Sequence, residues 1–197
     1  LQHMVYSRYM VRLVNHGYRP EDSRMLLKNA SRVCIDAGLE GVEVRDVRVA
    51  SKHIELDVSV EQSMLNKLLI EMERIAPTLG YTKIDEKSMS KDERILHARD
   101  LFNAERYWEA HEVLEGAWKD SKGDEKELIQ GIILVCAALV HAQKAEYDVC
   151  ISILARALDK LKNKPCRYHG LDIEGMVKRM MVALDNKDAR TMLEYRI

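Results

Sequence analysis

The chain has 197 residues, of which 47% are hydrophobic and 32% are charged, enough for one large domain or for two domains of about 100 residues. Nine glycines and three prolines are too few for a collagen-like, disordered or loop-dominated protein. The 31 basic and 32 acidic side chains leave a net charge of -1, without the basic excess that tracking of a long nucleic acid requires. We therefore expect a folded, helix-rich protein that does not track a long nucleic acid.

The start of the chain and its cysteines bear on the cellular compartment. Residues 1–3 precede Met4 and look like a remnant of cloning, so they are set aside. The longest apolar run, from Ile132 to Val140, is half of what a membrane span needs, and the four cysteines show no C-x-x-C pairing. We expect a cytoplasmic protein with reduced thiols, with no membrane partner and no structural zinc site.

A predicted α+β domain at residues 4–84 begins with a strand and a helix. The run from residue 9 to residue 14 reads Tyr-Met-Val-Arg-Leu-Val, which is typical of a strand. Pro20 then opens a helix whose apolar residues recur every three or four positions, and Gly38 closes it.

A hairpin, a second helix and a last strand follow in this domain. Alternating apolar residues predict two paired strands within residues 42–60, the first of them bulged or interrupted near Asp46. An apolar helix face over residues 65–75 stops before Pro77, and residues 80–84 return as a fourth strand. The βαββαβ order is that of a ferredoxin-like module, a plan that serves RNA readers, metal carriers, sensors and dimerisation modules alike.

Two features of the sequence argue against two of these uses, RNA reading and metal transport. The chain has a single Phe, and the strand from Ile54 to Val60 is aliphatic, whereas RNA readers stack bases on aromatic side chains. A metal carrier would hold a C-x-x-C loop after the first strand, where Asn15-His16-Gly17-Tyr18 stands instead. We therefore expect an interaction or dimerisation module here.

The remainder of the chain is predicted to be helical. Residues 85–90 are polar and aperiodic and form the expected linker to a second domain at 91–197, whose start carries the capping-box pair Ser90 and Glu93. No strand pattern interrupts this domain. The expected helices cover about 91–103, 107–120, 124–144, 147–163 and 172–186.

A weak internal repeat runs through these helices at an offset of 40 residues. Each copy consists of a helix, a short turn and a second helix. The matching pairs are Ala98 and Ala138, Tyr107 and Tyr147, Leu114 and Leu154, and Ala117 and Ala157.

A longer motif starts at Leu101 and reads Leu-Phe-Asn-Ala-Glu-Arg-Tyr-Trp-Glu-Ala-His-Glu-Val-Leu-Glu-Gly-Ala-Trp. It is followed by Ile-Gln-Gly from residue 129, Ala-Ala from residue 137, a histidine at 141, a proline at 165 and Tyr-His-Gly-Leu-Asp from residue 168. This ordered series, over about residues 94–180, resembles the domain-of-unknown-function family three hundred and nine. The resemblance implies a compact three-helix domain with peripheral helices and no established reaction. The chain departs from the family at Glu105, where a glycine is usual, and at Leu134, where a second glutamine is usual.

The second helix of this domain gathers the residue types of a chemical site. At 100° per residue, His111, Glu112 and Glu115 lie along the flank of its apolar face, beside Trp108 and Trp118. His111 and Glu115 are one turn apart, close enough for a hydrogen bond or for shared ligation of one ion.

The long third helix adds Gln130 and His141 on one stripe, but they are about 16 Å apart along the helix axis, so one small site cannot contact both. A divalent metal or acid-base catalysis is one reading of the cluster. The candidate catalytic residues are His111, Glu112, Glu115 and His141; the candidate metal ligands are His111, Glu115 and His141; the candidate binding residues are Trp108, Trp118 and Gln130. The alternative reading is structural: the His111–Glu115 pair caps the edge of a core, and His141 is a buried imidazole with a backbone partner.

Four basic residues cluster near the end of the fourth helix, where a phosphate or RNA contact is a further option. They are Lys160, Lys162, Lys164 and Arg167. Taken together, the sequence favours a protein of unknown function with a non-enzymatic binding or assembly role, alone or with an unknown protein partner; the alternative is a metal-dependent or acid-base enzyme. Because the long helix is apolar nearly all round and an open sheet has free edges, we expect a homodimer.

Overall fold

The computed structural model describes residues 5–197 and divides the chain into two compact units, which separate between Lys87 and Ser88. We call them the sheet unit and the helical unit. Residues 1–4, which include the expected cloning remnant at residues 1–3, lie outside the described residues. The point of division falls within residues 85–90, the expected linker. No helix of the described part is long and apolar enough to cross a membrane.

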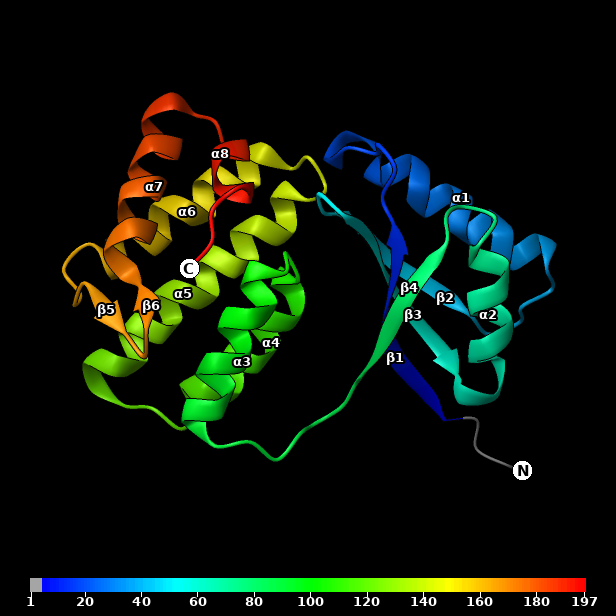
Figure 1. Cartoon of the computed structure of the whole chain (residues 1–197), viewed down its shortest axis with the longest axis horizontal. Coiled ribbons are helices and arrows are strands. Elements are labelled where there is room, and N and C mark those ends of the chain that lie inside the picture. Colours follow the sequence, from blue (N-terminus) through cyan, green and yellow to red (C-terminus); the bar gives the residue numbers. More distant parts are fainter. Residues whose placement is uncertain (1–4) are drawn as a thin grey trace. The chain divides into compact units, whose positions relative to one another are not determined.

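The sheet unit follows the predicted βαββαβ order, and with the helical unit after it the predicted α+β class is confirmed (Figure 1). Its main elements are β1 (Tyr6–Val14), α1 (Ser23–Asp36), β2 (Glu43–Val49), β3 (His53–Glu61), α2 (Leu65–Met72) and β4 (Thr78–Ile84), with single 3-10 turns at Pro20–Asp22 and Gln62–Met64. The strands form one antiparallel sheet in the order β2-β3-β1-β4. The bulge expected near Asp46 is confirmed as a register shift between Val44 and Asp46.

One face of the sheet is apolar because side chains alternate along each strand. On β3, Ile54, Leu56, Val58 and Val60 are fully buried in a core that also contains Leu26 of α1. Both helices of the unit lie on the same side of the sheet (Figure 1). Burial of this aliphatic face is therefore what holds the sheet unit together.

The opposite face of the sheet carries a charge network that the sequence did not predict. The Arg48 guanidinium donates to Glu55 at 2.6 Å, and Arg8 donates to the two carboxylate oxygens of Asp57 at 2.8 and 2.6 Å. Arg48, Glu55 and Asp57 are each 2% exposed or less. Burial alone would lower the pKa of Arg48, but the carboxylates of Glu55 and Asp57 outweigh it and raise that pKa. Because buried charge is tolerated only when it is paired, removing one partner would destabilise the sheet.

The helical unit confirms the predicted series of helices to within a few residues. The elements are α3 (Lys91–Asn103), α4 (Tyr107–Lys119), α5 (Gly123–Ala142), α6 (Tyr147–Leu161), β5 (Arg167–Tyr168), β6 (Leu171–Asp172), α7 (Ile173–Asn186) and α8 (Arg190–Leu193). The predicted capping box is also confirmed: the Ser90 hydroxyl accepts from the Glu93 amide, and the Glu93 carboxylate accepts from the Ser90 amide. These two bonds fix the start of α3.

A strand hairpin in the helical unit corrects the expectation that no strand interrupts this domain. β5 and β6 form a two-stranded hairpin, and α8 follows α7. The hairpin turn is His169-Gly170, both with positive φ (47° and 80°), as a tight two-residue turn requires. Strands of two residues are too short to leave an alternating pattern, and a four-residue helix is too short to leave an apolar period.

The two helical hairpins of this unit, α3–α4 and α5–α6, are joined by the same turn. Glu105 and Ala145 both adopt φ of 58°. In each turn the next amide bonds back five residues, from Arg106 to the Leu101 carbonyl at 2.9 Å and from Glu146 to the His141 carbonyl at 3.0 Å. The offset of 40 residues is therefore a repeat of backbone structure as well as of sequence, and the left-handed conformation at position 105 is one that favours glycine.

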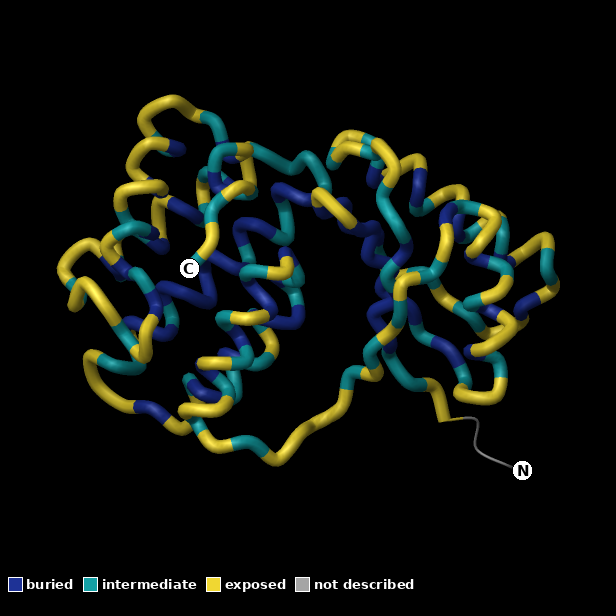
Figure 2. The backbone as a smooth tube through the Cα atoms, viewed as in Figure 1, coloured by how far each residue is buried: buried dark blue, intermediate teal, exposed yellow. Residues whose placement is uncertain are grey.

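The core of the helical unit is centred on α5, which α4, α6 and α8 pack against and which is dark along most of its length in Figure 2. The apolar residues all round α5 are thus buried against helices of its own unit. At Gly131 the contact with α6 is especially close, because a Cβ there would stand 2.6 Å from Leu161 Cγ. Neighbouring helices within the unit thus cover α5, which removes one of the two reasons for expecting a dimer.

Candidate functional site

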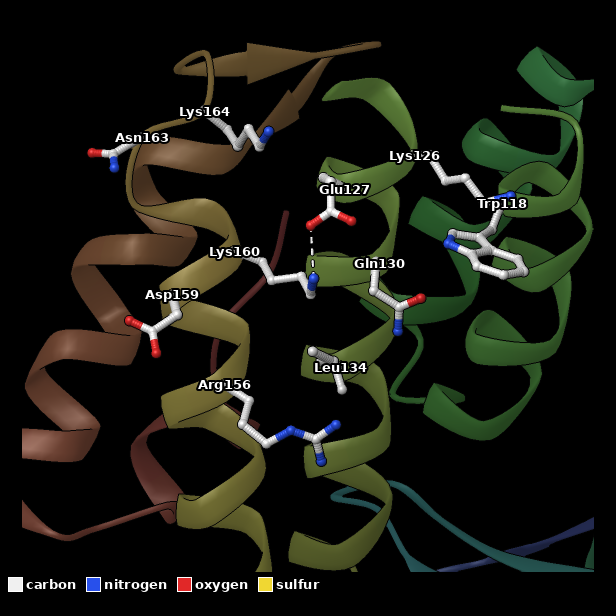
Figure 3. A pocket seen from close by; sticks show the side chains of 10 residues that line it. All are labelled: Trp118, Lys126, Glu127, Gln130, Leu134, Arg156, Asp159, Lys160, Asn163 and Lys164. Atoms are coloured by element: carbon white, nitrogen blue, oxygen red, sulfur yellow. Dashed lines mark hydrogen bonds and ion pairs between the residues drawn. The ribbon is translucent and has the colours of Figure 1, made fainter. Parts of the chain in front are cut away.

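A pocket of about 740 Å³ opens on the helical unit along α4, α5 and α6 (Figure 3). Its volume lies in the range of small-molecule sites. α4 contributes Trp118, α5 contributes Gln130, and α6 contributes Arg156. The pocket is therefore built by three consecutive helices of the helical unit.

The α4 side of the pocket is aromatic. Helical spacing buries Tyr107, Ala110 and Leu114 against the core, and Trp118, which follows on the same face, is only partly buried. The Lys126 ammonium lies 3.9 Å from the centre of the indole ring, a cation–π contact that covers one face of the ring. The indole is thus held in place at the pocket wall by a neighbouring cation.

The α5 side of the pocket presents an amide and an aliphatic side chain. Gln130 lies between Trp118 and the α6 side chains in Figure 3, and no residue of the described chain hydrogen-bonds its amide. Leu134, one turn further, also lines the pocket and adds an aliphatic side chain to this wall. Of the three candidate binding residues, the structure brings Trp118 and Gln130 to one pocket, whereas Trp108 is not among the lining residues.

The α6 side of the pocket carries three cations, Arg156, Lys160 and Lys164, which we call the cationic row. Lys160 bonds to Glu127 at 2.7 Å (dashed in Figure 3), and Lys164 lies 3.3 Å from an Asp124 oxygen. The hydrogen bond from Lys160 lowers the pKa of Glu127. Within residues 5–197 no ion pair or hydrogen bond engages the exposed Arg156 guanidinium. These partners are solvent-exposed, so an incoming anion can replace them at little cost.

Only two of the four basic residues that were expected to cluster near the end of this helix line the pocket. Lys160 and Lys164 line the pocket, but Lys162 pairs with Asp159 at 2.8 Å and Arg167 lies on β5, and neither lines it. Arg156 lines the pocket but was not among the predicted site residues. Its spacing of four residues from Lys160 and eight from Lys164 is the signal that could have found it, because residues four apart share a helix face.

A second cluster of chemical groups lies on the flank of α4, as predicted. His111 Nε2 lies 3.5 Å from Glu115, and His111 Nδ1 lies 3.4 Å from Glu112. One ligand atom from each of the three side chains fits within 4.8 Å of the others, a spacing that one metal ion could bridge. The imidazole is 24% exposed and the two carboxylates 43% and 46%, so the cluster lies at the surface.

His141, the fourth candidate, has different neighbours. Its Nδ1 lies 3.1 Å from Glu146, which also accepts from Lys144 at 2.9 Å, and it is not part of the three-residue cluster on α4. The structural alternative expected a backbone partner for this imidazole, and the partner shown is a side chain instead. Burial would raise the pKa of Glu146, but the hydrogen bonds from Lys144 and His141 outweigh it and lower that pKa.

One comparison with known proteins places a family match within the helical unit. Residues 95–152 match the family model described as Domain of unknown function (DUF309). The chain is 33% identical to a conserved hypothetical protein from Thermus thermophilus, whose crystal structure aligns over 46% of this chain and 94% of that chain with a TM-score of 0.41. No curated protein matches. The matched family segment contains Trp118 and Gln130, and the cationic row lies beyond its end.

Proposed function

Since residues 95–152 belong to the family Domain of unknown function (DUF309), which specifies no reaction, we propose that the helical unit is a non-enzymatic binding module for an anionic ligand. The observation that carries this proposal is the charge of the pocket. Four of its lining side chains are cationic and two, Glu127 and Asp159, are anionic. A concave site with an excess of positive charge concentrates anions and lowers the free energy of their binding.

The composition of the pocket supports binding rather than catalysis. Its ten lining residues include no histidine, cysteine or serine, the side chains that most often act as nucleophile or general base. What they offer is an indole, two amides, four cations and two carboxylates, Glu127 and Asp159, each of which is paired with a lysine. These groups recognise shape and negative charge, which is sufficient for a carrier, a sensor or a regulated assembly module.

Titration with pyrophosphate at low ionic strength, followed by calorimetry, tests the proposal. Arg156→Gln removes a cation without a competing partner and should weaken binding about tenfold. Lys162→Gln is the matched control, because it removes one positive charge from the same helix end outside the pocket, and it should change the affinity less than about twofold.

A third variant has the opposite expected sign. Glu127→Gln frees Lys160 from its carboxylate partner, so pyrophosphate should bind about two to three times more tightly. Absence of pyrophosphate binding, or equal losses in Arg156→Gln and Lys162→Gln, would contradict an anion site in this pocket.

The cluster on α4 supports a second candidate function, a metal-dependent or acid-base enzyme with a divalent cation as cofactor. The supporting observation is that one ligand atom from each of His111, Glu112 and Glu115 lies within 4.8 Å of the other two. Thermal melts with chelator and then with zinc, manganese or nickel test this candidate. A metal-dependent rise in melting temperature that disappears in His111→Ala and in Glu115→Gln would support it; equal melting temperatures with and without metal would exclude its metal-dependent form. His141→Ala tests the more distant candidate ligand in the same assay.

For the sheet unit we propose a ferredoxin-like dimerisation module at residues 4–84. β4 is an edge strand of the sheet, and its Leu79 and Tyr81 side chains are 58% and 48% exposed. An exposed apolar edge is a template for pairing with a second copy. Light scattering at micromolar concentration should give about twice the 22.7 kDa chain mass. Leu79→Arg should return the protein to a monomer, and a wild type that is monomeric at millimolar concentration would exclude the dimer.

Two further proposals concern the chain as a whole. We propose that residues 85–90 are a linker, supported by their lack of regular structure and the exposure of most of them. Limited proteolysis should cut there first and leave a folded helical unit, and simultaneous loss of both units would contradict it. We also propose a cytoplasmic location, supported by four free cysteines of which three are buried as small apolar side chains.

A further inference from the structure

We propose that the ligand of the pocket is a free nucleoside phosphate, with its base against the Trp118 indole and its phosphates along the cationic row. This inference rests on the proposed anion-binding function and names the ligand class for the same site. It follows from the arrangement of the lining side chains, which place an aromatic ring at one side of the pocket and the cationic row at the other (Figure 3). A ligand that satisfies both sides needs a flat apolar ring and a multiply charged anion in one molecule.

The base end is defined by Trp118 and Gln130. Lys126 covers one face of the indole at 3.9 Å, and the proposal places the incoming ring on the opposite face. Stacking of bases on aromatic side chains is tolerant of base identity, because every base has a flat π face. The Gln130 amide offers both a hydrogen-bond donor and an acceptor, and the edges of nucleobases combine the same two functions. Gln130 lines the pocket together with the indole, where it can bond the edge of a stacked base.

The phosphate end is defined by the cationic row on α6. Arg156 and Lys160 are four residues apart and so lie about 6 Å apart along the helix axis. Lys164 follows in the turn after the helix, where its amide bonds to the Leu161 carbonyl. The guanidinium can bind a phosphate through two parallel hydrogen bonds, and the ammonium groups act as point charges on the next phosphate.

The charge distribution favours a free nucleotide over a nucleic-acid chain. The net charge of the protein is -1, and Glu127 and Asp159 flank the cationic row inside the pocket. A polyanion that continued past the pocket would meet these carboxylates without a further cationic track. A pocket of about 740 Å³ is of the size that accommodates a single small molecule.

Calorimetry with four probes tests the inference in the full chain: ADP, CDP, adenosine and pyrophosphate. We expect ADP and CDP each to bind at least about fivefold more tightly than pyrophosphate, because stacking adds to the phosphate contacts. Adenosine should bind more weakly than ADP by about tenfold or more. The chain has two tryptophans, so ADP should shift one of two indole N–H signals in an NMR spectrum, and Trp108→Phe identifies the shifted signal as that of Trp118.

Variants at Trp118 separate stacking from a general loss of the site. Trp118→Leu keeps an apolar side chain and should reduce the ratio of ADP to pyrophosphate affinity to about one, whereas Trp118→Phe should keep most of that ratio. A wild type that binds pyrophosphate and ADP equally would overturn the nucleotide inference and leave the anion-binding function standing. A protein that binds none of the phosphates would overturn both. A deoxyadenosine dodecamer that binds more than about tenfold tighter than ADP would overturn the choice of a free nucleotide.

Discussion

Glycine at position 145 should stabilise the helical unit, although glycine usually weakens helical proteins. Ala145 lies in the left-handed region at φ of 58°, in the turn between α5 and α6. That conformation costs an alanine about 1 to 2 kcal/mol, and glycine adopts it freely. Against this gain, glycine raises the conformational entropy of the unfolded chain by an equivalent of about 0.4 to 1 kcal/mol. The net expectation for Ala145→Gly is a gain of about 0.5 to 1 kcal/mol in the free energy of unfolding.

The matched control is an Ala→Gly substitution within α6, where the backbone is helical. Ala155 is exposed in the middle of α6, where Ala→Gly should lower the free energy of unfolding by about 1 kcal/mol. Both tryptophans of the chain lie in the helical unit, so tryptophan fluorescence during urea unfolding reports on that unit. With a urea dependence of about 2 kcal/mol per molar, Ala145→Gly should raise the midpoint by about 0.2 to 0.5 M and Ala155→Gly should lower it by about 0.5 M.

The equivalent turn in the first hairpin adds an internal test. Glu105→Gly relieves the same left-handed conformation, but it also removes a buried carboxylate that lies 3.5 Å from Arg196. Its gain should therefore be smaller than that of Ala145→Gly. A midpoint that falls in Ala145→Gly as far as in Ala155→Gly would refute the assignment of strain to this turn.

Three further predictions concern packing, thiols and pH. Gly131→Ala should destabilise the helical unit by about 1 to 3 kcal/mol in urea unfolding, because its Cβ would clash with buried Leu161; an unchanged midpoint would show that the two helices can separate freely. In the native protein a thiol reagent at pH 8 should modify exposed Cys166 alone, since the other three cysteines are buried and burial raises their thiol pKa to about 11 or 12; rapid reaction of two or more thiols would contradict this. Hydrogen bonds from Lys91 and Tyr168 lower the pKa of Glu125 below its ordinary 4.5. The ionised Glu125 therefore stabilises the fold above pH 4.5, and this stabilisation is lost as the pH falls through the lowered pKa. Glu125→Gln should accordingly be less stable than the wild type at pH 7 and equally stable in acid, and a difference independent of pH would argue against the ionised pairing.

The elements that the sequence predicts well are those whose signal is local. The α3 start follows from a Ser and a Glu three residues apart, and the β2 bulge follows from a change in the parity of apolar residues around Asp46. Both are consequences of backbone geometry over a few residues. Such features depend on neighbouring residues alone, so they can be predicted without knowing how the rest of the chain folds.

The features that the sequence did not predict depend on residues brought together by the fold. Arg48 and Glu55 are recognisable as partners only once β2 and β3 are paired in register. The pocket needs Trp118, Gln130 and Arg156 from three helices, and no single helix carries its chemistry. The α4 cluster of His111, Glu112 and Glu115 was visible because its members share one helix, whereas the neighbours of His141 come from a turn whose direction the sequence pattern does not specify.

The repeated turn at Glu105 and Ala145 has a consequence for the order in which the two units form. Each helical hairpin closes over a short stretch of chain, so its contacts become available as soon as that stretch exists. The sheet unit is different, because β1 pairs with β4 from the far end of the same unit. The pair of Met10 and Thr82 can form only after the chain between them has been made. Folding rates fall as the mean sequence separation of contacts grows. The helical unit should therefore reach its native state sooner after its synthesis than the sheet unit does, although the ribosome makes it second.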